Sequence, residues 1–278
     1  MKELQINKEE MDTFDDKGYG IARIRIEKSD NNYNYIIWCG ETAECAVIDP
    51  LDSKPLIDFV REKSLVVRYV INTHAHPDHI AGNNSIVSAT DVKILIHGKG
   101  LQFVSKKSEL LEDGDEIDLG RKQIKVIHTP GHCPEHVSVV FGENVFVGDT
   151  LFLSGCGNTR YGGNVDELYE SIAFKLRNLP EGYRMFVGHN YAETNLRFSL
   201  TIEQSNQPAR RKLDEVMSAK SQGKEPHPTT IGEEKKYNPF LRFDVPELIA
   251  ELNKKKPSIS YDQKEIFREL REMRNNWK

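Results

Sequence analysis

The chain has 278 residues, of which 38% are hydrophobic and 29% are charged, and its formal net charge is −5. This composition is typical of a folded globular protein and argues against a disordered chain. The negative balance provides no general attraction to nucleic acid or to an anionic membrane, and no apolar run approaches the roughly 20 residues that span a bilayer. We therefore expect neither nucleic acid nor a membrane as a partner.

The first twenty residues are rich in Glu, Asp and Lys and lack the apolar stretch of a secretory signal. The four cysteines are too few and too irregularly spaced for a disulfide framework or a paired Cys-x-x-Cys zinc site, and we interpret them as reduced thiols. Cys39 and Cys45 flank a predicted turn, so a bridge between them is the alternative. These features predict a cytoplasmic location, and they leave the oligomeric state open.

From residue 21 to residue 187, short apolar runs rich in β-branched residues alternate with turn signals and a few helical stretches, which is typical of an α/β protein. The predicted strands are Ile21–Glu27, Tyr33–Cys39, Cys45–Ile48, Val66–Asn72, Lys93–Ile96, Gln123–His128, His136–Phe141, Val145–Val147 and Arg184–Val187. The predicted helices are Ser53–Lys63, Ala81–Ala89 and Val165–Asn178.

After Glu193 the sequence is dominated by charged, helix-forming residues without a strand signal. We predict a domain boundary there, with a metal-binding catalytic domain over residues 1–193 and a helical substrate-binding domain over residues 194–278. The helices predicted in the second domain are Ile202–Ala219, Pro246–Lys254 and Gln263–Asn275.

Four metal-capable side chains lie within six positions directly after the predicted strand that ends at Asn72, in the run Thr73-His74-Ala75-His76-Pro77-Asp78-His79. Strand alternation projects the two histidines of His-x-His to one side. The proline then redirects the chain before the Asp-His pair. The run therefore predicts two ligand sets for two neighbouring ions, with a polar surface loop as the alternative.

Three more metal-capable residues, His132, Asp149 and His189, follow later predicted strands, each beside a glycine. A single histidine or aspartate at a strand end is commonly a turn residue. Residues at strand ends converge on one edge of a sheet, however, so these loops can meet at one site. It is the combination with the first cluster that predicts a centre of seven ligands.

This ordered set resembles the metallo-β-lactamase superfamily, whose hallmark is Thr-His-x-His-x-Asp-His followed by a His, an Asp and a final His on later loops. The resemblance implies a four-layer αβ/βα sandwich, here with a C-terminal helical domain, and two divalent metal ions. By that resemblance the first ion is held by His74, His76 and His132, the second by Asp78, His79 and His189, and Asp149 bridges them. Nitrogen and oxygen donors suit zinc, our preferred cofactor, and also iron or manganese.

Several later segments resemble glyoxalase II, the hydroxyacylglutathione hydrolase family, and the resemblance spans roughly residues 33 to 278. It implies a metal-dependent hydrolase that cleaves S-D-lactoylglutathione or a related hydroxyacyl thioester to a hydroxy acid and a free thiol. A metal-held hydroxide would attack, and Asp78 would orient it as the catalytic residue. The segments are Gly148–Phe152, Gly155–Gly157, Gly188–Tyr191, Tyr237–Arg242 and Leu270–Trp277.

The same resemblance implies that Tyr191 contacts the glutathione part of the substrate and that Arg271 with Arg274 binds its carboxylate. Residues three apart on a helix share a face and can clamp an anion, although a solvated basic face is the alternative. The family usually carries a basic residue where this chain has Asn158. Tyr161 or Arg160 is then expected to supply the missing contact.

The main alternative is a persulfide dioxygenase, a relative on the same fold that uses one iron. There His74, His132 and Asp149 would suffice as a facial triad. That family resembles the chain poorly after Asn195. A metal-binding scaffold without catalysis is the second alternative.

Overall fold

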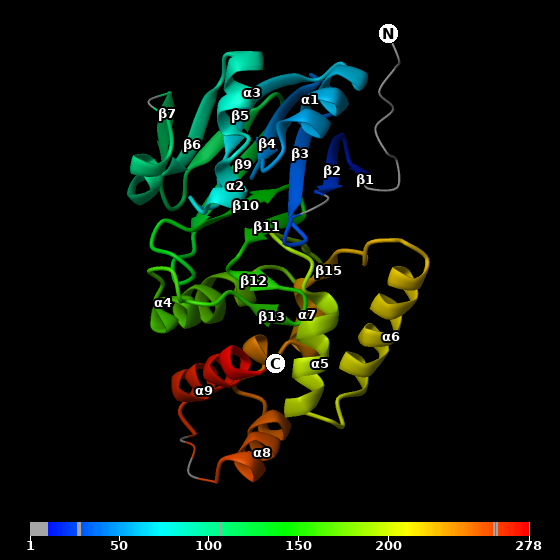
Figure 1. Ribbon diagram of the computed structural model, residues 1–278, viewed down its shortest axis with the longest axis vertical. Coiled ribbons are helices and arrows are strands. Elements are labelled where there is room, and N and C mark those ends of the chain that lie inside the picture. The colour runs from blue at the N-terminus through cyan, green and yellow to red at the C-terminus, as the bar shows by residue number, and fades with distance from the viewer. Residues whose placement is uncertain (1–10, 27–28, 106, 258, 260, 278) are drawn as a thin grey trace. The chain divides into compact units, whose positions relative to one another are not determined.

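The computed structural model describes all residues except 1–10, 27–28, 106, 258, 260 and 278, so the prediction about a signal segment lies partly outside the described residues. The chain forms two compact units (Figure 1), each described here by itself. The N-terminal unit comprises Met1–His128 and Glu135–Gly148, and the C-terminal unit comprises Thr129–Pro134 and Asp149–Lys278. Within the described part of the chain, every helix is too short or too polar to cross a bilayer.

A seven-stranded sheet in the order β1-β2-β3-β4-β5-β6-β7 forms the centre of the N-terminal unit. Strands β1 to β4 pair antiparallel and strands β4 to β7 pair parallel. Helices α1 and α3 cover one face of this sheet (Figure 1), where Leu56, Phe59 and Ile86 pack on Val47 and Val70. The strands are β1 (Met11–Asp16), β2 (Tyr19–Arg25), β3 (Tyr33–Cys39), β4 (Glu44–Ile48), β5 (Val66–Ile71), β6 (Lys93–His97) and β7 (Ser108–Leu111), and the helices are α1 (Ser53–Glu62), α2 (Pro77–Ile80), α3 (Asn83–Thr90) and the 3-10 helix η2 (Gly98–Phe103).

Four antiparallel strands of the same unit face the other side of that sheet. Buried aromatic rings join the two layers, with centroids 5.1 Å apart for Tyr19 and Phe141 and 5.1 Å apart for Tyr35 and Phe146. Strand β5 pairs with β4 and β6 in the seven-stranded sheet, and the loop with the predicted metal motif follows its end. The four strands are β8 (Glu116–Leu119), β9 (Lys122–His128), β10 (Val137–Phe141) and β11 (Asn144–Gly148).

The C-terminal unit is mainly helical. Helices α5 and α6 lie side by side (Figure 1) and bury Leu196 against Val216, while Phe267 of α9 packs edge-on against Phe240, with ring centroids 5.4 Å apart. The elements are β12 (Leu151–Phe152), β13 (Gly155–Cys156), α4 (Val165–Glu170), the π-helix η3 (Ser171–Lys175), η4 (Leu176–Asn178), β14 (Arg184–Val187), α5 (Ala192–Ile202), α6 (Gln207–Ser221), β15 (Thr229–Thr230), α7 (Ile231–Tyr237), η5 (Pro239–Leu241), α8 (Pro246–Lys255) and α9 (Gln263–Asn276).

Most predicted strands and helices are confirmed to within two or three residues, but the edge strands were missed. The strand predicted at Ile21–Glu27 is β2, which begins two residues earlier, and strands β1, β7, β8, β12, β13 and β15 were not predicted. Polar residues in β1 obscure the alternation of apolar and polar side chains that marks a strand. Among them, Asp12 forms an ion pair with the buried Arg23 of β2. The alternative of a bridge between Cys39 and Cys45 was wrong, because all four cysteines are free thiols.

Two predictions about residues 194–278 were also wrong. The helix predicted at Ile202–Ala219 corresponds to α6, which begins only at Gln207, and Ile202 instead ends α5, a helix that was not predicted. The Asn206 side chain caps α6 and Pro208 occupies its first turn, so the chain must leave helical geometry just before them. The region also holds a short strand, since Thr229 pairs with Met185 of β14.

Candidate metal and substrate sites

The loop after β5 carries four of the seven predicted ligands. His74 Nε2 lies 3.1 Å from His76 Nδ1, and His79 Nε2 lies 3.7 Å from Asp78 Oδ2. Pro77 starts the one-turn helix α2 directly after the His-x-His pair, which turns Asp78 and His79 in a new direction. The structure thus forms the two donor pairs that the sequence predicted.

Asp49 supports this loop and was missed in the sequence. It is 2% exposed. Its Oδ1 accepts the backbone N–H of Thr73 at 2.8 Å, and its Oδ2 accepts the Thr73 hydroxyl at 2.6 Å. The same Oδ2 lies 3.1 Å from Nδ1 of His79, and a proton on Nδ1 leaves the Nε2 lone pair for a metal. The available signal was a strand-end carboxylate after Ile48, but the following Pro50 made it look like an ordinary turn residue.

Replacing Asp49 with asparagine is expected to weaken the binding of one metal ion by about 10- to 100-fold. The amide would place a donor against Thr73 or His79 and favour the wrong tautomer of His79. Metal content after dialysis against a graded chelator series measures the effect, with Asp91→Asn as an exposed control in the same unit. Equal metal retention in both variants would remove Asp49 from the support of the site.

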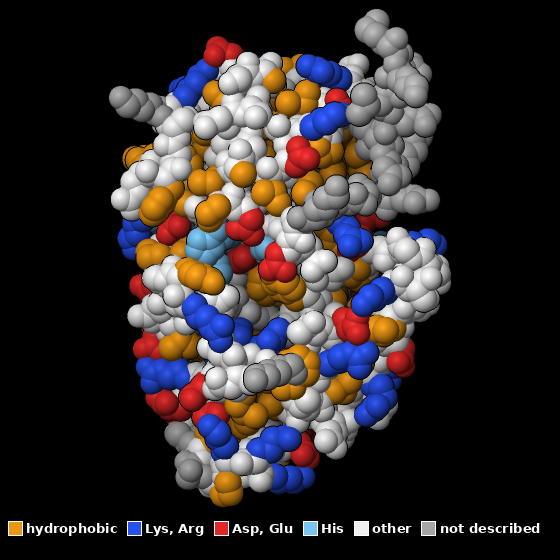
Figure 2. Space-filling model, in the orientation of Figure 1, with side chains coloured by type: hydrophobic (Ala, Val, Ile, Leu, Met, Phe, Trp, Pro, Cys, Tyr) orange, Lys and Arg blue, Asp and Glu red, His pale blue; other side chains and the backbone are white. Residues whose placement is uncertain are grey.

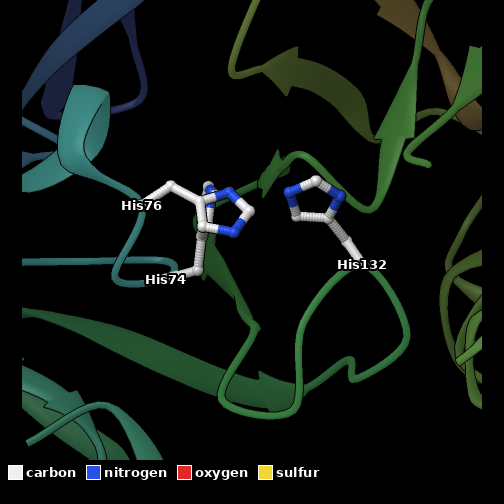
Figure 3. A group of neighbouring side chains, drawn as sticks. All are labelled: His74, His76 and His132. Carbon is white, nitrogen blue, oxygen red and sulfur yellow. The ribbon is translucent and has the colours of Figure 1, made fainter. Parts of the chain in front are cut away.

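The other three predicted ligands form a cluster in the C-terminal unit. Asp149 Oδ2 lies 3.3 Å from His189 Nε2 and 3.7 Å from His132 Nε2, and all three side chains are buried. Nδ1 of His132 lies 2.8 Å from the Asn158 carbonyl oxygen, which accepts its proton and leaves Nε2 for a metal. Figure 3 shows His74 and His76 on the loop that follows β5, and His132 on the loop that follows β9.

Gly157 lies against this cluster at a distance that only glycine permits. A Cβ at position 157 would stand 2.0 Å from the Asp149 carbonyl oxygen and 3.0 Å from His132 Nδ1. A side chain there would collide with the backbone of Asp149 and press on the His132 ring. The Gly155-Cys156-Gly157 segment, part of the resemblance noted in the sequence, therefore packs directly against two of the predicted ligands.

A cavity of about 270 Å³ in the C-terminal unit contains four of the five predicted substrate residues, Tyr191, Arg271, Arg274 and Asn158. Tyr161 does not line it and is 72% exposed, whereas Arg160, which was only an alternative, does line it. Figure 2 shows a hollow on the viewed face with Lys or Arg side chains at its edge. The lining residues, all in the described part of the chain, are Phe152, Cys156, Asn158, Arg160, Tyr191, Asn195, Arg271, Arg274, Asn275 and Trp277.

The arginines of this cavity are held by hydrogen bonds and meet no carboxylate among its lining residues. Arg271, 5% exposed, donates from Nη1 to the carbonyl oxygens of Cys156 at 2.7 Å and Gly157 at 3.2 Å. Arg274 donates to Asn195 Oδ1 at 3.3 Å. Burial, together with the charge of Arg271, lowers the pKa of Arg274 from its ordinary value. Uncompensated positive charge makes the cavity suited to an anionic group.

Aromatic rings connect this cavity to the ligand cluster of the same unit. The ring of Tyr191 stacks on His189 with centroids 5.0 Å apart and planes 6° apart. Phe152 meets Tyr191 edge-on at 5.2 Å. A molecule in the cavity therefore lies beside a metal-capable histidine.

The donor types in each cluster suit a divalent metal ion. They are imidazole nitrogens and carboxylate oxygens, the ligands that zinc, iron and manganese accept. In each cluster an acceptor outside the seven predicted ligands, Asp49 or the Asn158 carbonyl, fixes a histidine tautomer, and Asp49 itself lies within metal-binding range of His74 and His79. Such support is typical of protein metal sites.

Comparisons with known proteins agree with this arrangement. A family model of the metallo-beta-lactamase superfamily matches residues 30–189, and a model described as hydroxyacylglutathione hydrolase C-terminus matches residues 190–277. A hydroxyacylglutathione hydrolase from Polaromonas sp. is 36% identical over 92% of this chain and 99% of its own length. A protein named hydroxyacylglutathione hydrolase cytoplasmic, from Arabidopsis thaliana, is 34% identical over 78% of this chain and 86% of its own. The crystal structure of ETHE1 from Myxococcus xanthus covers 86% of this chain and 92% of its own, at 25% identity and a TM-score of 0.63.

Proposed function

The chain belongs to the hydroxyacylglutathione hydrolase family of the metallo-beta-lactamase superfamily, and from this membership we propose that it hydrolyses S-D-lactoylglutathione or a closely related hydroxyacyl thioester. The products are a hydroxy acid and a free thiol. One observation carries the proposal, namely a cavity with three arginines whose Tyr191 stacks on the metal-capable His189. It supports binding of an anionic carrier with the thioester next to the donors.

Two divalent ions, with zinc preferred, are part of this proposal. They would lower the pKa of a bound water from about 15.7 towards 7 and polarise the thioester carbonyl. The donor chemistry of the two clusters and the family membership support the assignment. The proposed ligands are His74, His76 and His132 for one ion, Asp78, His79 and His189 for the other, and Asp149 for both.

The remaining roles are assigned to residues of this chain. Asp78 orients the attacking oxygen as the catalytic carboxylate, and Tyr191 holds the carrier beside His189 by its ring contact. Arg271 and Arg274 bind the carrier's carboxylate by charge-assisted hydrogen bonds. Arg160 replaces the basic residue that the family usually has at the position of Asn158.

The proposed boundaries are a catalytic domain over residues 1–193 and a substrate-binding domain over residues 194–278. The change of matching family model between residues 189 and 190 supports this division. A cytoplasmic location is proposed because the four cysteines are buried free thiols. Disulfides form and persist in oxidising compartments outside the cytosol.

A steady-state assay with S-D-lactoylglutathione, run beside metal quantification on the purified protein, tests the function. We expect release of free glutathione by protein that holds two ions per chain. Protein that holds one iron, consumes oxygen with glutathione persulfide and leaves the thioester intact would overturn the proposal.

Replacing Arg160 with alanine is expected to raise KM for S-D-lactoylglutathione about three- to tenfold with little change in kcat, because a contact to the carrier persists from ground state to transition state. Arg160 is a cleaner test than Arg271, whose truncation would also release the Cys156 and Gly157 carbonyls. Arg210→Ala, an exposed arginine on α6, is the matched control. An unchanged KM in Arg160→Ala would exclude that side chain from the substrate site.

A further inference from the structure

Asn32 lies just before β3 and reaches a proposed ligand from outside the metal motif. Its Nδ2 donates to Asp78 Oδ2 at 3.0 Å and lies 3.5 Å from the Asp78 carbonyl oxygen. That Oδ2 is the oxygen that lies 3.7 Å from His79 Nε2. The Asn32 amide therefore binds the carboxylate oxygen of Asp78 that lies on the side of His79, the second residue of this donor pair.

The backbone around Asn32 fixes this contact. Its N–H donates to Ser29 Oγ at 3.2 Å, and its carbonyl accepts the Ile26 N–H at 3.0 Å. The side chain is 1% exposed. Because a carboxylate oxygen accepts and cannot donate, the amide group must face Asp78 with its nitrogen.

The other end of the same amide has no evident structural use. Asn32 Oδ1 is buried and, within the part of the chain that the structure describes, has no hydrogen-bond partner. A buried carbonyl without a partner is unfavourable, so an apolar side chain would be the more stable choice at this position. The polar residue is explained by its bond to Asp78.

We propose that Asn32 is a positioning residue that fixes the orientation of Asp78 toward its metal ion, in parallel with Asp49, which fixes His79 on the same loop. This inference rests on the proposed function, since it assumes that Asp78 and His79 hold an ion. Asn32 touches neither the substrate nor the reacting atoms. Its effect is exerted through the ligand that it holds.

Two substitutions separate hydrogen bonding from packing. Asn32→Leu keeps the number and branching of the side-chain heavy atoms and removes the donor, whereas Asn32→Ala removes the donor and most of the side chain. Zinc titration of the metal-free protein against a chromophoric chelator measures the two binding events. Asn144→Leu and Asn144→Ala are the controls, because Asn144 is also buried in the same unit and donates to the Tyr19 hydroxyl and the Phe141 carbonyl, outside the metal motif.

Both Asn32 variants are expected to weaken one binding event about tenfold or more and to leave the other unchanged. Both controls should lower the melting temperature without changing either event. Asn32→Leu with the zinc affinity of wild type, or a loss of zinc affinity in Asn32→Ala alone, would mean that Asn32 acts by packing. Either result would overturn the proposal. If Asn32→Leu does not fold, Asn32→Ala compared with Asn144→Ala decides. Failure of the proposed function has a different signature, which is wild-type protein with two ions and no thioester hydrolysis.

Discussion

Replacing Asp149 with alanine is expected to lower kcat/KM for a hydroxyacyl thioester by at least about 10³-fold, because a water without its metal ions has a pKa near 15.7 rather than near 7. Asp149 supplies the only carboxylate of the C-terminal donor cluster formed with His132 and His189. Without it, each ion loses the carboxylate that both are proposed to share and keeps only its three other proposed ligands. Metal content should fall together with activity.

The experiment measures metal per chain and steady-state rates for Asp149→Ala and for Asp214→Ala, an exposed aspartate on α6 that serves as the control. Circular dichroism establishes that the variant is folded. Activity within tenfold of wild type, at any metal content, would contradict the assignment of Asp149 as a shared ligand.

The second prediction with a large expected effect concerns the pH dependence of stability and rests on one buried carboxyl group, that of Glu234. Glu234 is fully buried. Its Oε2 accepts the Ser154 N–H at 2.8 Å and its Oε1 accepts the Thr229 hydroxyl at 2.8 Å. Burial outweighs these hydrogen bonds and raises the pKa of Glu234 from 4.5 to about 7. Ser154 follows β12, so Glu234 holds the hairpin that carries Phe152 and Cys156 of the cavity.

A raised pKa in the folded state means that the folded protein binds this proton more tightly than the unfolded chain. The stabilisation is present below pH 4.5 and is lost as the pH rises through about 7. Between pH 5 and pH 8 the loss in the free energy of unfolding is about 2 to 3 kcal/mol. Glu234→Gln, which imitates the protonated carboxyl, is therefore expected to flatten the pH dependence and to be more stable than wild type at pH 8.

Urea unfolding of metal-free protein at both pH values measures this difference, with Glu215→Gln on the exposed side of α6 as the control. Parallel pH dependences for wild type and Glu234→Gln would show that Glu234 is already ionised in the folded protein at pH 5.

The seven proposed ligands could be predicted because their residue types are rare and clustered. Four stand in one run of six positions, and the others follow apolar strands beside glycines. Asp49 and Asn32 could not be predicted in this way. An aspartate before proline and an asparagine in a polar turn are ordinary turn residues, and only the folded chain shows that they hold His79 and Asp78.

The choice between Tyr161 and Arg160 also required the structure. Both residues lie in one loop, where the Asn158 side chain accepts the Arg160 N–H at 3.0 Å and Gly162 adopts a positive φ of 84°. These local turns decide which side chain faces the cavity, and they are not encoded in hydrophobic periodicity. The central strands of the sheets were predicted well because their side chains are apolar. The short edge strands β1, β7 and β8 were not predicted, because polar residues interrupt their hydrophobic pattern.

At residue 158 the main chain and the side chain have separate tasks, because only the main-chain carbonyl accepts the hydrogen bond from His132. The acceptor is the main-chain carbonyl of Asn158, which every amino acid possesses, while its side chain lines the cavity. On the proposed function, substitution at this position can therefore alter which thiol carrier is preferred without turning the imidazole away from the proposed metal ion. A lineage that exchanges one low-molecular-weight thiol for another could thus retune its enzyme here and keep the hydrolytic chemistry intact.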